Sequence, residues 1–188
     1  EDLQLIPISN YNKTKMLAER ILFSHKNHMK IFCIRPATVC GYSSRMRLDL
    51  TVNMLTMQAL KNKKITVLGG NQIRPNIHIQ DMVNVYLHFL SNLNLPSGCY
   101  NAGFENLSVL DIAKKIQKKI PSEIIISNSN DLRSYRLDSS RLISSGFKVK
   151  YVIENAIDEV IQYFNKGILK DEESFYTVNW MKKLNLES

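Results

Sequence analysis

KIFCIRP, residues 30–36, is the stretch that decides the fold class of this 188-residue chain. Its centre is apolar without alternation, and Pro36 ends the run. A short unbroken apolar run of this kind is typical of a parallel strand buried on both faces. Such strands are covered by helices on both sides, so the stretch predicts an α/β protein.

The sequence on either side of this run alternates predicted helices with short predicted strands. A helix is expected over residues 10–26, and its apolar residues Leu17, Ile21 and Leu22 share one face. Further helices are expected over 51–60, from about 81, over 108–120, over 138–145 and over 152–165. Further strands are expected over 65–68, 76–80, 100–102 and 123–127.

Caps and loops complete this outline. Asp81 is the expected N-cap of the helix that carries Val83, Tyr86, Leu87 and Leu90 as apolar residues. Ser108 is the expected N-cap of the next helix, with an acidic residue three positions further on. Residues 36–48 are predicted to form an irregular loop, and the tail from residue 170 has no strong period.

Composition narrows the class of protein. The 25 lysines and arginines exceed the 17 acidic residues by eight, but the excess is spread along the chain and no nucleic-acid-binding motif accompanies it. We therefore expect no nucleic-acid partner. No apolar stretch is long enough to cross a membrane, so no membrane association is expected. Three cysteines without metal-site spacing argue against disulfides and zinc, and they favour a reducing cytoplasm.

Tyr11 and Lys15 form the first pair with chemical meaning. They are four residues apart on a predicted helix, so they share one face. An ammonium group beside a phenol favours the phenolate and turns the tyrosine into a usable base near neutral pH. The spacing alone is weak evidence, because exposed pairs of this kind occur in many helices.

Three motifs follow one another along the chain: YNKTK at 11–15, RPATVCG at 35–41 and RPNIHIQD at 74–81. Together they resemble the extended short-chain dehydrogenase/reductase family, in its NAD-dependent nucleotide-sugar epimerase/dehydratase group. The resemblance extends over about residues 5–165. It departs from the family pattern at Cys40, where the family has tyrosine, and at Tyr42, where it has proline.

The resemblance implies the C-terminal portion of an NAD(P)-binding Rossmann-like doubly wound fold with a small α/β substrate-binding subdomain. Residues 1–50 would be the C-terminal part of the cofactor domain. Residues 51–170 would mainly form the substrate-binding subdomain, with some segments returning to the Rossmann sheet, and 171–188 would be a tail. The glycine-rich dinucleotide turn is absent from this sequence. We therefore expect the cofactor-binding half to be missing and this fragment to be inactive alone.

The resemblance also implies roles for residues at the cofactor. Tyr11 would exchange a proton with a sugar hydroxyl, and Lys15 would hydrogen-bond the nicotinamide ribose. The backbone of Pro36, Ala37 and Val39 would line the nicotinamide pocket. The cofactor would be NAD or NADP, with NAD favoured, and the helix over 10–26 would form a homodimer interface.

Other residues are implied to bind the nucleotide-sugar substrate. Asn53 would bind its diphosphate, and Arg74 would contact the nucleotide or its phosphates. Arg133, in DLRSYRLD at 131–138, would reach the diphosphate or would lie in a solvated loop. Arg45 and Arg47 follow the nicotinamide strand and would meet a charged substrate group, unless they are simply exposed.

Three functions remain open from the sequence. The first is an NAD(P)-dependent epimerase or dehydratase of a nucleotide-activated sugar. The second is an NADPH-dependent reductase of a keto sugar or another carbonyl compound. The third is a non-catalytic relative that binds RNA or a protein, although such a relative has no need of the pair Tyr11 and Lys15.

Overall fold

The computed structural model describes residues 1, 5–7, 9–128 and 134–184. Its helices are α1 (Asn10–Ser24), α2 (Thr51–Asn62), α3 (Ile79–Ser91), α4 (Val109–Lys119), α5 (Ser140–Ser144), α6 (Ile153–Asn165), the 3-10 turn η1 (Glu173–Phe175) and α7 (Thr177–Lys183). Its strands are β1 (Phe32–Pro36), β2 (Thr38–Cys40), β3 (Lys64–Leu68), β4 (Ile73–His78), β5 (Gly98–Ala102), β6 (Glu105–Ser108) and β7 (Glu123–Ser127).

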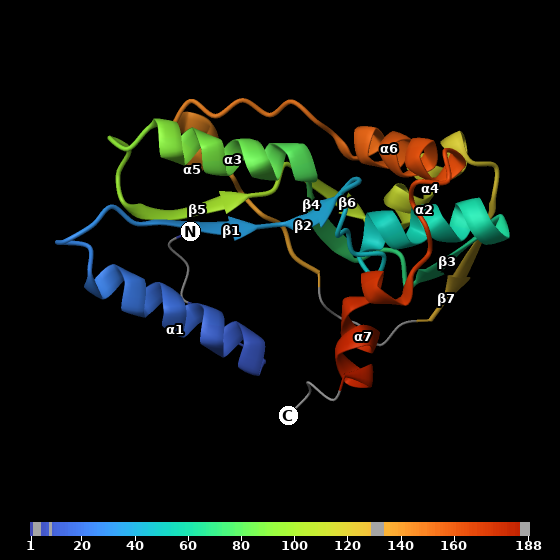
Figure 1. Cartoon of the computed structure of the whole chain (residues 1–188), viewed down its shortest axis with the longest axis horizontal. Coiled ribbons are helices and arrows are strands. Elements are labelled where there is room, and N and C mark those ends of the chain that lie inside the picture. The colour runs from blue at the N-terminus through green and yellow to red at the C-terminus, as the bar shows by residue number, and fades with distance from the viewer. Residues whose placement is uncertain (2–4, 8, 129–133, 185–188) are drawn as a thin grey trace.

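The apolar run at residues 30–36 forms β1, which pairs in parallel with β5. Helix α3 covers one face of this pair and α1 lies on the other side (Figure 1). On the α3 face, the ring of Phe32 stacks on Phe89 with centroids 4.8 Å apart, and Phe89 contacts Tyr100 at 4.7 Å. The prediction of a parallel strand is therefore confirmed, but burial on both faces is not: within β1 only Cys33 is buried, and α1 buries none of its residues against it.

A second sheet joins β2, β4 and β6, with β2 parallel and β6 antiparallel to β4. The sequence did not predict β6, and it assigned β2 to an irregular loop, which was wrong. Strand β2 has three residues and β6 has four, which are too few to show a periodic pattern. Their pairing partners are distant in the chain, so long-range contacts decide their conformation.

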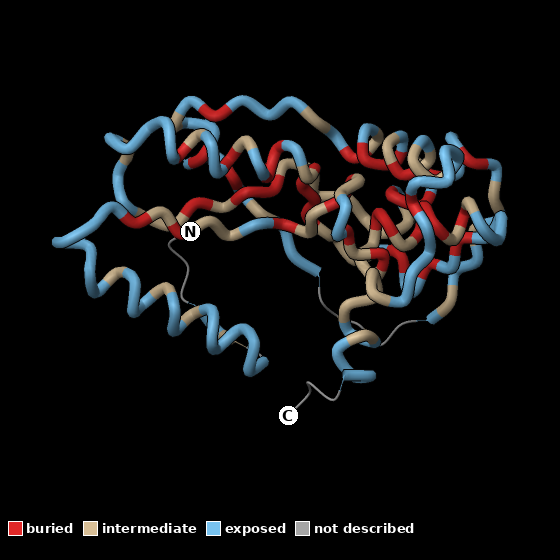
Figure 2. The backbone as a smooth tube through the Cα atoms, in the orientation of Figure 1, coloured by how far each residue is buried: buried red, intermediate tan, exposed pale blue. Residues whose placement is uncertain are grey.

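The third sheet pairs β3 in parallel with β7, and helices α2, α4 and α6 pack beside it. Figure 2 shows the buried residues concentrated in this part of the molecule and between α3 and β5. The core here is aliphatic; its fully buried members include Val52, Leu55, Ile65, Ile112, Ile116 and Ile157. Burying such side chains stabilises the fold by roughly 1.5–3 kcal/mol each.

Helix α3 begins two residues earlier than predicted. His78, not Asp81, is its N-cap, and the His78 Nδ1 atom accepts a hydrogen bond from the Gln80 backbone N–H at 3.1 Å. Asp81 is instead completely buried, and its Oδ2 accepts from the backbone N–H groups of Lys150 at 3.0 Å and Tyr151 at 2.9 Å. Asp81, in the first turn of α3, therefore holds the backbone at residues 150 and 151 rather than capping its own helix.

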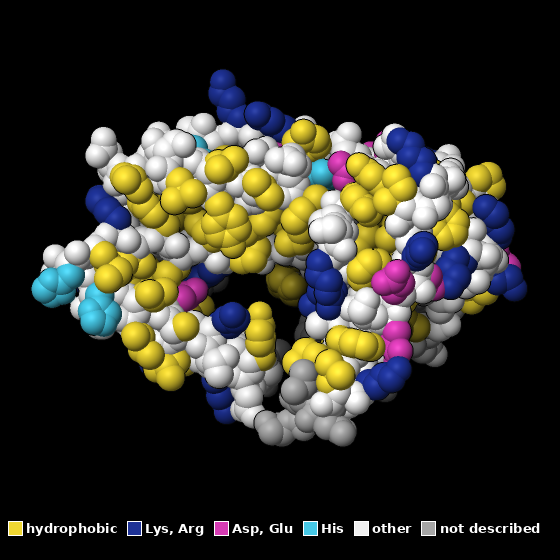
Figure 3. Space-filling view, viewed as in Figure 1, with side chains coloured by type: hydrophobic (Ala, Val, Ile, Leu, Met, Phe, Trp, Pro, Cys, Tyr) yellow, Lys and Arg dark blue, Asp and Glu magenta, His cyan; other side chains and the backbone are white. Residues whose placement is uncertain are grey.

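Two apolar surfaces lie open. The outer face of α3 exposes Val83, Tyr86, Leu87 and Leu90, and Figure 3 shows hydrophobic side chains gathered over this helix.

None of the described residues of α1 is buried. Its main link to β1 is the Arg35 guanidinium, which donates to both carboxylate oxygens of Glu19 at 2.9 and 2.6 Å.

The Asp81 anchor predicts a stability effect. We expect Asp81→Ala to lower the free energy of unfolding by about 2–3 kcal/mol, because two backbone N–H groups lose a charged acceptor. Asp158→Ala removes a 58% exposed carboxylate and is the control, with an expected loss below about 0.5 kcal/mol. Urea unfolding measures both values, and equal losses in the two variants would contradict the anchoring role.

The link between Glu19 and Arg35 predicts a pH effect on α1. The hydrogen bond from Arg35 holds the pKa of the Glu19 carboxyl below its ordinary value of 4.5. A lowered pKa in the folded state means that the pair stabilises fully above the ordinary value and loses its effect as the pH falls through the lowered one. Below pH 4.5, amide exchange in α1, corrected for its intrinsic rate, should rise relative to exchange in α4.

Glu19→Gln is the control for this prediction. The variant should show fast exchange in α1 at every pH, because it has no carboxyl group to titrate. Protection of α1 in the wild-type protein that stays constant from neutral pH down to about pH 3 would contradict the role of the ion pair.

Candidate active site

A cavity of about 650 Å³ lies where β1 passes into β2 and where α1 begins. Its volume is in the range of small-molecule binding sites. The first turn of α1, residues 36–39, the loop between β2 and α2, and the start of α2 contribute most of its lining, and Ile79 and Tyr135 complete it. Its lining residues include Tyr11, Pro36, Ala37, Thr38, Val39, Ser43, Arg45, Arg47, Leu50, Asn53 and Tyr135.

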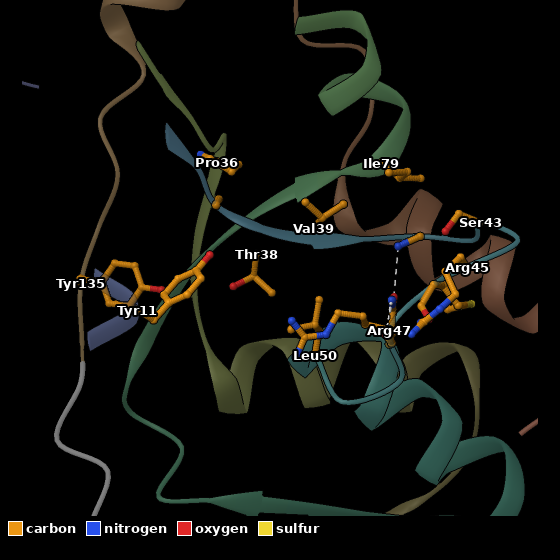
Figure 4. A pocket seen from close by; sticks show the side chains of 14 residues that line it. Tyr11, Pro36, Thr38, Val39, Ser43, Arg45, Arg47, Leu50, Ile79 and Tyr135 are labelled. Atoms are coloured by element: carbon orange, nitrogen blue, oxygen red, sulfur yellow. Dashed lines mark hydrogen bonds between the residues drawn. The ribbon is translucent and has the colours of Figure 1, made fainter. Parts of the chain in front are cut away.

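The two ends of the cavity differ in chemistry. In Figure 4, the phenol groups of Tyr11 and Tyr135 lie at one end, near Thr38. Ser43 and Arg45 lie at the other end. The cavity therefore offers hydroxyl groups at one end and positive charge at the other.

Tyr11 and Lys15 occupy successive turns of α1. The Ser9 hydroxyl caps this helix by accepting a hydrogen bond from the Asn12 N–H at 3.1 Å, which places Tyr11 in the first turn. Lys15 Nζ lies 5.4 Å from the centre of the Tyr11 ring. Lys15 is not among the described residues that line the cavity, so Tyr11 is the member of the pair that faces it.

Arg47 and Asp49 form a bidentate ion pair at the cavity, with distances of 2.8 and 2.9 Å. The hydrogen bonds to Asp49 raise the pKa of the Arg47 guanidinium. Burial alone would raise the pKa of Asp49, but the hydrogen bonds from Arg47 keep it below its ordinary value. Among the described residues, no carboxylate pairs with Arg45, so its charge at the cavity is uncompensated.

Asn53 is almost completely buried, at 2% exposure. Its Oδ1 accepts from the Gly41 N–H at 3.1 Å, and its Nδ2 donates to the Arg47 carbonyl at 3.0 Å. Both functions of the amide are thus used to tie together the two ends of the loop between β2 and α2. Asn53 would therefore influence a bound ligand mainly by fixing the shape of this loop.

A second, smaller cavity of about 230 Å³ shares Thr38, Leu50 and Tyr135 with the first. Arg74 lines it, with its guanidinium 5.9 Å from the centre of the Tyr135 ring. Helix α2 starts here at Thr51 without a side-chain cap. The positive end of the helix dipole and Arg74 favour an anion such as a phosphate, and the Asp49 carboxylate, which lines the same cavity, is already paired with Arg47.

The structure thus brings Tyr11, Pro36, Ala37, Val39 and Asn53 to one cavity and Arg74 to its neighbour. Arg133 lies outside the described residues. Sequence reasoning did not single out Thr38, Tyr135 or the start of α2. The only signal for the last of these is the absence of a capping side chain at Leu50, just before a strong helical pattern.

Comparisons with known proteins give the family. The model of the NAD dependent epimerase/dehydratase family matches residues 1–103. Anthocyanidin reductase from Arabidopsis thaliana is 27% identical over 172 residues, which are 85% of this chain and 50% of that protein. UDP-glucose 4-epimerase from Lactobacillus helveticus is 27% identical over 186 residues, which cover 86% of this chain and 56% of the relative.

Solved structures agree with these relatives. UDP-glucuronic acid 4-epimerase from Bacillus cereus, in complex with UDP-glucuronic acid and NAD, matches with a TM-score of 0.75 and 27% identity, over 88% of this chain and 55% of the other. An NAD-dependent NDP-hexosamine 5,6-dehydratase of tunicamycin biosynthesis matches with a TM-score of 0.75 and 26% identity, over 88% and 57%. The chain spans about half the length of the curated relatives it matches.

These matches agree with the parallel strands, the covering helices and the order of the motifs. The family is NAD(P)-dependent, and its structural neighbours have the Rossmann fold. Because the family model covers more than half of the residues, this chain belongs to the NAD-dependent epimerase/dehydratase family, within the extended short-chain dehydrogenase/reductases.

Proposed function

We propose that this chain carries the substrate-facing part of an NAD(P)-dependent epimerase or dehydratase that acts on a nucleotide-activated sugar. One observation carries the proposal. Tyr11 lines a cavity that adjoins a second one with Arg74 and the uncapped start of α2. A proton-transfer group and an anion site are therefore neighbours, as the sugar and the diphosphate of such a substrate require.

The residues present fit the nicotinamide end of the cofactor. Tyr11 and the backbone of 36–39 line a cavity of sufficient size, and Lys15 places an ammonium group one helical turn from the phenol. In the proposal these residues hold the nicotinamide and its ribose, with NAD favoured over NADP. When bound, the nicotinamide supplies the acceptor and donor of hydride.

Tyr11 moves the proton in this proposal. Its phenolate oxygen takes the proton from a sugar hydroxyl as the carbon is oxidised, and it returns a proton when the ketone is reduced. The Lys15 ammonium lies over the Tyr11 ring, 5.4 Å from its centre, one helical turn from the reacting hydroxyl. Because 68% of the Tyr11 side chain is exposed, a bound substrate and cofactor would have to exclude water from it.

The substrate diphosphate is assigned to the smaller cavity. Arg74 and the N–H groups at the start of α2 bind it, and Asn53 shapes the adjacent loop. Arg133 remains a proposed further contact to the same diphosphate.

We retain the division into residues 1–50, 51–170 and 171–188 as part of this proposal. We also assign the protein to the cytoplasm.

A homodimer through α1 belongs to the same proposal. Leu17 and Ile21 are each 55% exposed and Leu22 is 45% exposed, so α1 presents an apolar face without a partner among the described residues. A second copy of the helix would cover these side chains.

No helix in the described part of the chain has the length and hydropathy needed to span a membrane.

Reduction of a carbonyl compound is the second candidate function. Its support is the similarity to anthocyanidin reductases and to vestitone reductase from Medicago sativa, which is 24% identical over 161 residues. The same tyrosine and lysine pair would then donate a proton to the carbonyl oxygen. A reductase of this kind has no need of the anion site at Arg74, so nucleotide binding distinguishes the two functions.

The test of catalysis uses the full-length protein that contains this chain. Tyr11→Phe should lower kcat by about 10²–10⁴-fold for UDP-glucose or UDP-glucuronic acid with NAD, because the proton acceptor is lost. Proton NMR of the sugar product measures the rate. Tyr86→Phe, on the exposed face of α3, is the control and should retain full activity. Unchanged turnover in Tyr11→Phe would reject the proposed mechanism.

The test of the anion site is the binding of UDP to this chain by calorimetry. Arg74→Ala should raise the Kd on the order of tenfold, because one charge-assisted hydrogen bond to phosphate is worth roughly 1.5–3 kcal/mol. Arg20→Ala removes the same charge from the exposed surface of α1 and should leave the Kd unchanged. If both variants bind UDP as the wild-type chain does, Arg74 does not contact the nucleotide.

A further inference from the structure

We infer that Glu159 and Tyr163, both on α6, are positioning residues that fix the wall of the substrate cavity by holding Tyr42. Neither residue lines the cavity itself, and Tyr42 does not line it either, but its chain neighbours Gly41 and Ser43 do. The part of the inference that concerns ligand binding rests on the proposed function. Its structural part, the order of the loop between β2 and α2, is independent of any ligand.

Glu159 holds the backbone at the start of this loop. Its Oε2 accepts a hydrogen bond from the Tyr42 N–H at 3.1 Å, although the two residues are 117 positions apart. The same oxygen lies 3.3 Å from Nε2 of His78, whose side chain is fully buried. His78 Nδ1 accepts from the Gln80 N–H at 3.1 Å, whereas the buried Nε2 makes no hydrogen bond with any described residue and only lies close to the carboxylate.

Tyr163 holds the side chain of the same residue. It lies four positions after Glu159, so both project from one face of α6. Its ring stacks on the ring of Tyr42 with centroids 3.7 Å apart and planes at 9°. Helix α6 therefore contacts Tyr42 through both its backbone and its ring.

Gly41 makes the close approach possible. It has a φ of +105°, which residues with side chains rarely adopt. A Cβ atom at this position would come within 3.0 Å of Glu159 Oε2 and 3.1 Å of His78 Nε2. The absence of a side chain at Gly41 thus leaves room for the Glu159 carboxylate and the His78 ring to meet beside the turn.

The remainder of the loop also depends on α6. Met46 and Leu48 are buried in one cluster with Val160, which lies next to Glu159 on the helix. Ser43, Arg45 and Arg47, on the same loop, line the cavity. Asn53, on α2, holds Gly41 and Arg47, and Glu159, on α6, holds Tyr42, so loss of the α6 contacts should free the first residues of the loop.

The experiment compares matched pairs of variants of this chain. Glu159→Ala removes the acceptor, whereas Glu159→Gln keeps an oxygen at the same place. Tyr163→Ala removes the stacked ring, whereas Tyr163→Phe keeps it. Hydrogen exchange of the amides in 41–50 is measured against those of α2 and β3, and UDP binding is measured by calorimetry.

In both alanine variants, the Tyr42 amide should exchange at least tenfold faster, with α2 and β3 unchanged, and the Kd for UDP should rise several-fold. The glutamine and phenylalanine variants should match the wild type. This selective effect separates positioning from a general loss of stability. Exchange that rises equally in α2 and β3, or that stays at the wild-type rate at Tyr42, would overturn the inference.

The two proposals fail in different ways. If the wild-type chain does not bind UDP but Tyr42 responds as described, the nucleotide assignment fails and the loop-positioning inference stands. If the alanine variants free the loop but bind UDP as tightly as the wild type, the nucleotide assignment stands and the effect of α6 on binding is rejected.

Discussion

The side-chain amide of Asn53 holds both ends of the loop between β2 and α2, and the cavity takes its shape from this contact. The carbonyl oxygen accepts from Gly41 and the amide group donates to Arg47, in a site only 2% exposed. An apolar residue of the same size would leave the buried Gly41 N–H without its acceptor and the half-buried Arg47 carbonyl without this donor. With the loop fixed, Arg47 and Asp49 pair at the cavity and α2 begins there with free N–H groups.

Tyr11 is held far less firmly than this loop. It lies on α1, a helix of 15 residues without a buried side chain, and helices of this length are marginal in water without packing. The pair between Glu19 and Arg35 is its main anchor. Strand β1 pairs with β5 alone among the described strands, so its other edge is open. The chain spans about half the length of the curated relatives it matches.

The sequence predicted the elements with strong local patterns: the apolar run that became β1, the amphipathic helices, and the Ser108 cap of α4. The family resemblance singled out Tyr11, Pro36, Ala37, Val39 and Asn53, which line the cavity, but it did not single out Thr38, Leu50 or Tyr135. Sequence reasoning failed where distant contacts decide the outcome. Strand β2 forms against β4, Asp81 anchors residues 150 and 151, and Glu159 reaches Tyr42 across 117 positions. No local pattern encodes such contacts.

Amide NMR of this chain during titration with UDP-glucuronic acid tests the central claim, that one site joins the start of α2 to Tyr11. The account predicts saturable shifts at Gly41, at residues 47–53 and at Tyr11, with one common Kd. Shifts confined to another surface, such as the groove between α3 and residues 146–150, would contradict it. An absence of saturable shifts at any residue would contradict it as well.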